Sequence, residues 1–449
     1  MLKLTTTVHE EAALTKILLA EIELKQASSQ CYDALLDFLR TLCNEVLELT
    51  NSVLDYLKTT PKPIPEHEEL LRNWLVLGSY VVRQINNYCD SFEYAEVLSV
   101  PTAMMQLLNR LFRQVTKNKE FIVRGTASFN YTYQPIGQSL NKLASRFPSD
   151  KTPKLEDSFA IITFPLLYGK SVMANCNLVH ELGHLIADSM DLNKRLDDSL
   201  SVEKRKKITE IIEQTVLPPG GQVDFGFAQR KKRANMILEN WIHETMADYI
   251  GILLLGPCTL FAFMKLMEPL ASHQTDDDEH PCNSSRVGMM LEILEVLKWD
   301  KVINQECPEI LKRAKDLSGL ERAINQTNEY NAAAICLPIV KEEIFEIVRK
   351  LCKTFTYKPQ AFRRFNDTVN GLLERGIPPA EKMGDGTTID KFVKIDAVSI
   401  LNSGWFFYEN NYPSWEERFS KFEAVERAAF LNRLIAKAIE ITFIEEPAS

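Results

Sequence analysis

The sequence predicts a mainly α protein with a small β-sheet, which places it in the α+β class. Apolar residues recur at helical spacing over most of the chain, whereas strand signals are clear in only two segments. With 449 residues the chain is longer than an ordinary single domain. We therefore expect a core that contains the sheet, residues 119–298, between helical regions that span residues 1–118 and 299–449.

A seam of apolar residues follows a seven-residue repeat in the first helical region. Its positions are Leu35, Leu39, Leu42, Val46, Leu49, Val53 and Tyr56. Such a narrow stripe on one long helix packs either in a dimerisation coil or within an intramolecular bundle, and the short repeat favours the bundle. Pro61, Pro63 and Pro65 end the segment, and helical pattern resumes from Glu66 to about Lys117. If the protein forms an oligomer or binds a protein partner, we expect the contacts to be made by these helical regions.

Two segments carry the strand pattern. In Ser128–Tyr133 large aromatic residues alternate with small polar ones, which is typical of a half-buried strand. Ser158–Tyr168 is the second candidate, and Pro165 places its later part at a sheet edge because proline lacks an N–H donor. We expect the first part, Ser158–Thr163, to hold an extended substrate by strand addition.

Residues 178–188, LVHELGHLIAD, have the spacing of a helical metal site. His180 and His184 are four residues apart, so on a helix both imidazoles lie on one face and reach one metal ion. Glu181 lies about 100° round the helix from His180, beside the metal rather than among its ligands. That position suits a general base that takes a proton from metal-activated water. The pattern predicts a catalytic zinc ion.

A catalytic zinc ion needs a third protein ligand and an open position for water. Residues 239–251, ENWIHETMADYIG, have helical character and offer Glu244 as this ligand. Asp248 follows one turn later on the same face, where it accepts a hydrogen bond from the free nitrogen of a ligating histidine. His243 is the competing ligand, although it points about 100° away from the face of Glu244 and Asp248.

HELGH followed by ExxADxxG resembles the gluzincin metallopeptidases and, among them, the HtpX and CAAX prenyl protease family. A His-Pro pair further along, with an arginine six residues after the histidine, is similar too. Beyond HELGH, the matching residues are Glu244, Ala247, Asp248, Gly251, His280, Pro281 and Arg286. The resemblance implies a zincin-like core, a Zn²⁺ cofactor and a protein or peptide substrate. It also implies that His280 and Arg286 help to bind the substrate carbonyl and its developing oxyanion.

Membrane members of that family have transmembrane helices around the catalytic core, and this chain departs from them. Its longest uncharged run, Tyr249–Met264, is shorter than the roughly 20 residues of a membrane span and contains Gly256-Pro257. We expect two buried helix segments there and no membrane span. A prenylated or membrane-embedded substrate therefore does not fit.

Composition excludes other classes. A formal charge of -9 argues against nucleic-acid binding, which requires a basic surface. The nine cysteines are odd in number, widely spaced and without a CxxC pair, which argues against a disulfide framework and a thiolate zinc site. Residues 1–24 have no apolar stretch of signal-peptide type. The expected location is the cytoplasm.

Three further segments are expected to be loops or irregular connections, and two of them have two possible functions. Asp191–Arg233 reads as a charged, irregular connection whose basic clusters are either a docking patch or, more commonly, solvated faces. The acidic run Asp276–Glu279 is either a mobile flap over the site or a solvated loop. The aromatic stretch Trp405–Trp415 is expected to be a packed loop.

These observations predict a zinc metalloendopeptidase, a hydrolase of peptide bonds with Glu181 as general base. Two alternatives belong to other classes. One is a helical scaffold that keeps a metal site without turnover. The other is a partner-regulated effector, a toxin or defence protease, whose metal site is silent until activated.

Overall fold

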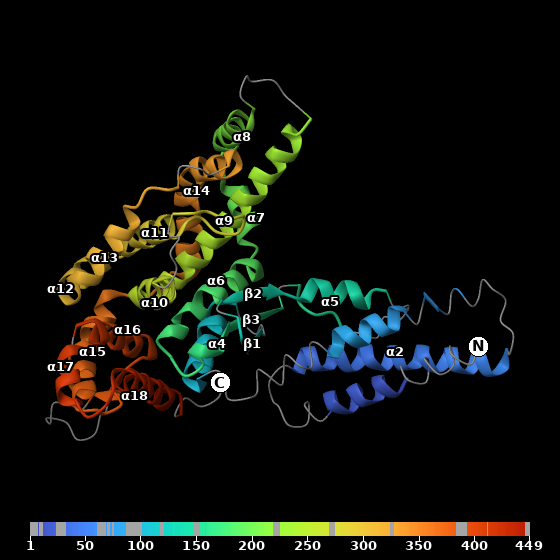
Figure 1. The fold of residues 1–449 in the computed structure, drawn as a ribbon, viewed down its shortest axis with the longest axis horizontal. Coiled ribbons are helices and arrows are strands. Elements are labelled where there is room, and N and C mark those ends of the chain that lie inside the picture. Colours follow the sequence, from blue (N-terminus) through green and yellow to red (C-terminus); the bar gives the residue numbers. More distant parts are fainter. Residues whose placement is uncertain are drawn as a thin grey trace. The chain divides into compact units, whose positions relative to one another are not determined.

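The structure is a computed structural model that describes residues 8, 12–23, 33–60, 69, 72–73, 76–86, 101–116, 121–128, 130–146, 153–157, 159–218, 225–268, 274–323, 327–382, 393–410 and 412–444. Helices predominate and a small sheet accompanies them, which confirms the predicted fold class (Figure 1).

The chain divides into two compact units. An N-terminal unit comprises residues 1–99, 120–125 and 134–163, and a larger unit comprises 100–119, 126–133 and 164–449. These boundaries differ from those of the three regions expected from the sequence. The expected boundaries follow changes in composition, whereas the chain passes from one unit to the other within its strand segments. A division into three separately folding domains stays a prediction.

In the N-terminal unit, helix α2 (Asp33–Thr59) buries its heptad seam. Leu35, Leu39 and Leu42 are fully buried and cluster with apolar residues of the helical segments 12–23 and 76–86 and of α5 (Gly137–Ala144). Since the seam finds its partners within one chain, this packing favours the intramolecular bundle over the dimer coil. The prolines at 61, 63 and 65 lie outside the described residues.

The small sheet has the strand order β1–β3–β2, formed by β1 (Phe121–Thr126), β3 (Ala160–Pro165) and β2 (Thr132–Pro135). β3 confirms the strand predicted in Ser158–Tyr168, but it is the central strand, so the prediction of an edge position is wrong. Because β3 is paired with a strand on each side, a substrate cannot add to the sheet at Ser158–Thr163, and that prediction is wrong too. The strand predicted in Ser128–Tyr133 begins only at Thr132. A separate antiparallel pair joins β4 (Glu381–Lys382) to β5 (Val393–Lys394).

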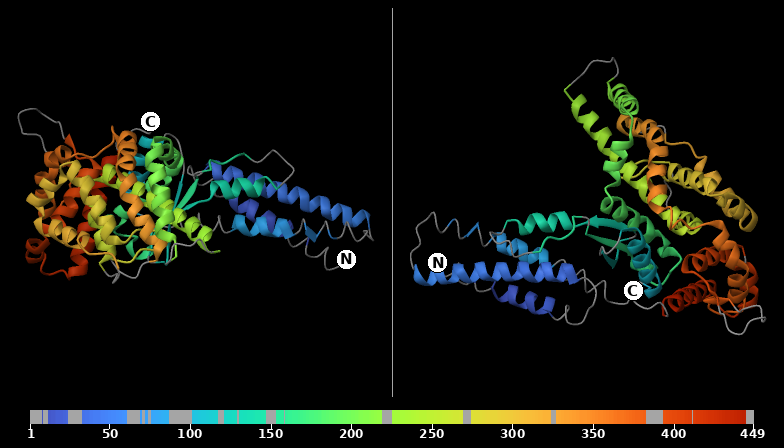
Figure 2. Two further views of the ribbon diagram at one scale, coloured as in Figure 1. Left: turned by 90° about the horizontal axis from the view of Figure 1, so that it is seen from above. Right: turned by 180° about the vertical axis from the view of Figure 1, so that it is seen from behind.

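Helices form nearly all of the larger unit. They are α4 (Thr102–Thr116), η1 (Leu166–Tyr168), η2 (Ala174–Asn177), α6 (Leu178–Ser189), α7 (Leu192–Ser199), α8 (Val202–Val216), α9 (Phe227–Leu255), α10 (Pro257–Met267), α11 (Asn283–Val296), α12 (Trp299–Glu306), α13 (Pro308–Ser318), α14 (Asn328–Cys352), α15 (Pro359–Glu374), α16 (Ala397–Asn410), α17 (Tyr412–Arg418) and α18 (Ala424–Ile444). The long helix α9 packs against both α6 and α14 (Figures 1 and 2).

Glycine permits the close approach of α6 and α9. A Cβ atom at Gly183 would lie 2.7 Å from both the Cα and the carbonyl oxygen of Ala247. Real Cβ atoms do not come this close to backbone, because the van der Waals radii overlap. The glycine of HELGH and the alanine of ExxAD therefore let the two helices pack with their backbones in contact.

The apolar run Tyr249–Met264 forms two buried helix segments, as predicted. Gly256 ends α9 with φ 73°, a left-handed value that glycine adopts without strain, and Pro257 begins α10. In the part of the chain that the structure describes, no helix combines the length and the apolar character needed to cross a bilayer.

Two loop predictions are wrong. Trp405, Phe406 and Phe407 are buried as predicted, but they lie on helix α16, which is covered on several sides by α10, α15 and α18. The expected irregular connection Asp191–Arg233 is largely helical and contains α7, α8 and the start of α9.

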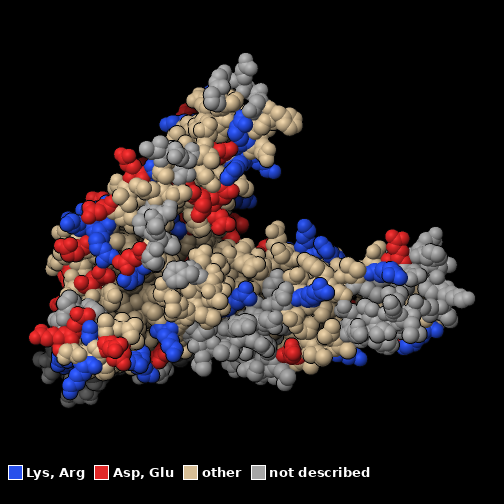
Figure 3. All heavy atoms as spheres, in the orientation of Figure 1, with Lys and Arg blue, Asp and Glu red and all other residues tan. Residues whose placement is uncertain are grey.

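The basic clusters of α8 and α9 lie among acidic partners. Lys204 pairs with Glu343, and Lys231 pairs with Glu213. On the face that Figure 3 draws, basic and acidic side chains of the larger unit are interspersed. This distribution favours solvated faces over a docking patch.

Candidate metal centre

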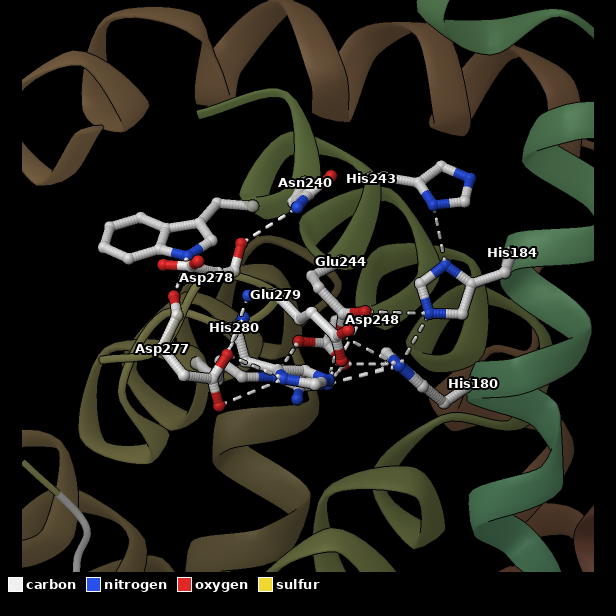
Figure 4. Close-up of polar contacts among 12 residues, drawn as sticks. His180, His184, Asn240, His243, Glu244, Asp248, Asp277, Asp278, Glu279 and His280 are labelled. Atoms are coloured by element: carbon white, nitrogen blue, oxygen red, sulfur yellow. Dashed lines mark hydrogen bonds and ion pairs between the residues drawn. The ribbon is translucent and has the colours of Figure 1, made fainter. Parts of the chain in front are cut away.

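Helix α6 brings two histidines to one point. Its apolar residues Leu178, Leu182 and Leu185 are buried, which orients the opposite face of the helix toward α9. His180 and His184 project from that face, and their Nε2 atoms lie 3.1 Å apart. The i,i+4 spacing read from the sequence therefore places both imidazoles as expected (Figure 4).

Glu244 of α9 completes a triangle with the two histidines. Its Oε1 lies 3.0 Å from Nε2 of His184, and its Oε2 lies 3.2 Å from Nε2 of His180. With zinc bonds of about 2.0–2.1 Å, tetrahedral ligands lie about 3.3 Å apart. The triangle is close to that size, and a set of two imidazoles and one carboxylate is a zinc-binding set. These three residues fit the metal that the sequence predicts.

Charges around the triangle favour a cation at its centre. Burial lowers the pKa of His184 to about 4, against the pull of Glu244, so this imidazole is neutral. Burial opposes a charge on His180 as well, yet Asp248 and Glu244 raise its pKa to about 10. Burial also opposes ionisation of Glu244, but His184, His180 and Arg286 hold the pKa of this carboxyl well below its usual range. A metal ion would replace the His180 proton, since a ligating imidazole is neutral.

Asp248 lies behind His180, where the sequence placed it. Its Oδ1 is 2.8 Å from Nδ1 of His180, and its side chain is only 2% exposed. Arg286 of α11 holds the same carboxylate in a two-pronged contact, from Nε at 2.9 Å and from Nη2 at 2.8 Å. This arrangement orients His180 with its Nε2 toward Glu244.

Arg286 occupies a different place from the one that the resemblance implies. Its guanidinium is buried, contacts Asp248 and Glu244, and stacks over the ring of Phe263 at 4.7 Å. It does not line the cavity at the site. The geometry therefore favours a role for Arg286 in positioning Asp248 and Glu244, and not a direct contact between Arg286 and a substrate carbonyl.

The triangle opens into a cavity of about 280 Å³. Its walls come from the residues that lead into β2, from α6 and α9, and from the loop before α11. The lining residues are Asn130, Tyr131, Thr132, Tyr133, His180, Glu181, His184, Asn240, His243, Glu244, Glu279 and His280.

Glu181 lines this cavity although it is largely buried. Burial raises its pKa to about 7, while His180 draws the pKa down. A carboxyl with such a pKa exchanges protons near neutral pH. Glu181 therefore lies beside the triangle, where the sequence places it, and its role as general base stays a prediction.

In the acidic run before α11, Asp277 and Glu279 are exposed, whereas Asp276 and Asp278 bond to neighbouring elements. Asp276 is buried, receives the backbone N–H of Cys282 and pairs with Arg322. Asp278 pairs with Arg233 at 3.0 Å and accepts the hydroxyl of Tyr330 at 2.7 Å. These contacts attach the run to α9 and α14.

The same loop presents His280 to the cavity. Nδ1 of His280 lies 3.1 Å from Oδ1 of Asp277, and its Nε2 lies 3.6 Å from Oε1 of Glu244 (Figure 4). His280 thus lies beside the triangle, 100 residues after His180 in the chain. Asp277, which holds it there, is a functional candidate that the sequence analysis did not identify.

His243 contacts a ligand residue from outside. Its Nδ1 lies 3.1 Å from Nδ1 of His184, the nitrogen that faces away from Glu244. From its sequence position His243 was expected only as a competing ligand. No role was expected for Asp188, which lies next to it, or for Tyr133, which bonds to Asp188. The position of Asp188 four residues after His184 was an available signal, because it puts both on one helix face.

Comparison of the chain with family models, with curated proteins and with solved structures finds no match. The resemblance to the gluzincins therefore stays a prediction from the three motifs.

Proposed function

We propose that this protein is a zinc-dependent peptidase whose metal ligands are His180, His184 and Glu244. The observation that supports this most directly is their convergence on one point, with a fourth polar side chain, Glu181, lining the same cavity. A bound zinc ion supplies a Lewis acid that polarises a carbonyl and lowers the pKa of water toward about 7.

Glu181 moves the proton in this proposal. Its ionised carboxylate takes a proton from the attacking water and later passes it to the leaving amine. Its raised pKa suits both steps, because a group that is protonated only below about pH 4 would hold the proton too weakly to deliver it. No other buried carboxylate of the cavity is available for this role, since Glu244 belongs to the metal triangle.

His280 supplies a donor to the oxyanion in this proposal. Asp277 accepts a hydrogen bond from Nδ1–H, which leaves Nε2 directed to the cavity beside Glu244. A protonated Nε2 donates to the negative oxygen that develops on the substrate carbonyl. Asp277 favours the charged imidazole too, because its carboxylate raises the pKa of His280 although burial opposes this.

An extended peptide segment fits the cavity better than a folded domain. β2 is the last strand in the order β1–β3–β2 among the described residues, so its outer side is a sheet edge. The residues from Asn130 to Tyr133 that lead into and begin this strand line the cavity. We propose strand addition at β2, in place of the excluded site on β3.

Cleavage profiling of whole-proteome digests tests the proposal. The zinc-loaded wild type should produce new peptide termini that are absent with Glu181→Gln at equal zinc content. A wild type that binds zinc and cleaves neither a denatured generic substrate nor the proteome would overturn the peptidase and favour the scaffold. The cytoplasmic location is tested separately by fractionation of cells that express the protein.

A further inference from the structure

The two histidines of the triangle have different supports. His180 offers Nε2 to the triangle, and its Nδ1 is held by Asp248. His184 also offers Nε2, but its Nδ1 faces the Nδ1 of His243 at 3.1 Å (Figure 4). No carboxylate takes this position among the described residues.

Chemistry sets the direction of the contact between the two imidazoles. A neutral histidine that ligates through Nε2 carries its proton on Nδ1. His184 offers Nε2 to the triangle, so Nδ1 is the ring nitrogen that remains to carry a proton. Its Nδ1–H must then donate, and His243 must accept with an unprotonated Nδ1. His243 consequently carries its own proton on Nε2.

A carboxylate lies close to the nitrogen that carries this second proton. Nε2 of His243 lies 3.1 Å from Oδ1 of Asp188, within hydrogen-bonding distance although not aligned as a hydrogen bond. The other oxygen of Asp188, Oδ2, accepts the hydroxyl of Tyr133 at 2.6 Å. Burial favours the neutral acid, but His243 and Tyr133 hold the pKa of Asp188 below its usual range. Asp188 is thus ionised and able to accept from both neighbours.

Three elements supply this chain of contacts. His184 and Asp188 lie one turn apart on α6, His243 comes from α9, and Tyr133 comes from β2. The ring of Tyr133 also stacks on the ring of His184, with centroids 5.7 Å apart and planes at 21°. The same tyrosine therefore touches both the ligand residue and the end of the chain that supports it.

We infer that His243, Asp188 and Tyr133 form a hydrogen-bonded chain that selects the Nδ1–H tautomer of His184 and holds its ring in position for zinc. His243 is then a positioning residue and not a ligand. The inference rests on the metal site of the proposed function, but it does not depend on peptide cleavage. It also links the strand proposed to hold substrate to a metal ligand through Tyr133.

Zinc affinity, measured by competition with a chromophoric chelator, tests the inference. His243→Leu should weaken zinc binding about 10–100-fold, the usual effect of losing an outer partner of a ligand. His243→Asn should weaken it much less, because its amide oxygen can accept near the former position of Nδ1. Asp188→Asn and Tyr133→Phe should have smaller effects. His243→Leu combined with Asp188→Asn should bind zinc no worse than His243→Leu alone, since both act in series.

Tyr330→Phe is the matched control. It also removes a tyrosine-to-aspartate hydrogen bond in the same unit, but the aspartate is Asp278. Its zinc affinity should equal that of the wild type. Melting curves of the metal-free variants check the fold, and a smaller zinc-induced rise in Tm gives a second readout. If His243→Leu does not fold, His243→Asn and Asp188→Asn retain the test.

Two results would overturn the inference. Wild-type affinity in His243→Leu would show that His184 needs no support from this side. Loss of zinc in His243→Asn, together with its retention in Glu244→Ala, would make His243 a ligand. The variants could follow the expected order of zinc affinity in a protein that cleaves no peptide. That result would overturn the proposed peptidase and support the chain of positioning residues.

Discussion

At the residue scale, a single turn of α6 carries two candidate metal ligands and the candidate base. His180 and His184 face the triangle, whereas Glu181 lines the cavity next to it. The two carboxyl groups have opposite pKa shifts, because burial raises the pKa of Glu181, whereas the two imidazoles and Arg286 outweigh burial at Glu244. In the proposed function these shifts suit Glu181 to the role of base and Glu244 to that of ligand.

Glu181→Gln should separate these roles. The amide cannot take a proton, but no ligand is lost, so zinc content should stay at the wild-type level. Peptide hydrolysis should fall by a factor of about 10²–10⁴. Elemental analysis and kcat/KM on a denatured substrate measure the two effects, with the exposed Glu239→Gln as control. Wild-type hydrolysis in Glu181→Gln would contradict the mechanism.

Asp277→Asn tests the support of His280. The amide should still bond to the ring but should no longer favour its charged form, so kcat should fall about tenfold with zinc retained. His280→Ala should lower kcat further. The double variant should be no worse than His280→Ala, because Asp277 acts only through that ring. A further loss in the double variant would show that Asp277 acts elsewhere.

At the element scale, the contact of α6 with α9 places all three ligands. Gly183→Ala would put a methyl group 2.7 Å from the backbone of Ala247 and force the helices apart. We expect a loss of about 1–3 kcal/mol in the free energy of unfolding, together with weaker zinc binding. Gly371→Ala on α15 is the control, because its added methyl group meets nothing within 4 Å. Chemical denaturation and zinc titration measure both, and equal behaviour of the two variants would refute this packing argument.

The heptad seam of α2 makes a second prediction at this scale. Leu42 is fully buried within the N-terminal unit. Leu42→Asp should cost about 3–5 kcal/mol by placing a charge in that core, and the N-terminal unit should lose its cooperative melting. Light scattering and a melting curve check this prediction. A variant that stays folded but becomes a monomer would instead indicate that the seam forms a dimer coil.

At the scale of the whole molecule, zinc should stabilise one unit and not the other. All three proposed ligands lie in the larger unit, and the α2 core lies in the N-terminal unit. Zinc at about 1,000 times its Kd should add about 4 kcal/mol to the stability of the larger unit. Calorimetry with zinc and with a chelator checks this. The melting transition of the N-terminal unit is the one that Leu42→Asp removes. If zinc shifted that transition, the prediction would be wrong.

The sequence by itself determined the local part of the site. Helical periodicity relates His180 to His184 and Glu244 to Asp248, since residues four apart on a helix share a face whatever surrounds them. The same periodicity predicts the mainly helical fold and the long helix α2. The break at Gly256-Pro257 follows from the backbone preferences of these two residues alone.

Only the tertiary structure decided how distant segments meet. Strand order put β3 in the middle of the sheet and left β2 at the edge. Packing also turned Arg286 toward Asp248 and His243 toward His184, and it attached the acidic run to α9 and α14. These contacts join residues tens of positions apart, and their geometry depends on the helix crossing and the sheet order, which local spacing in the sequence does not encode.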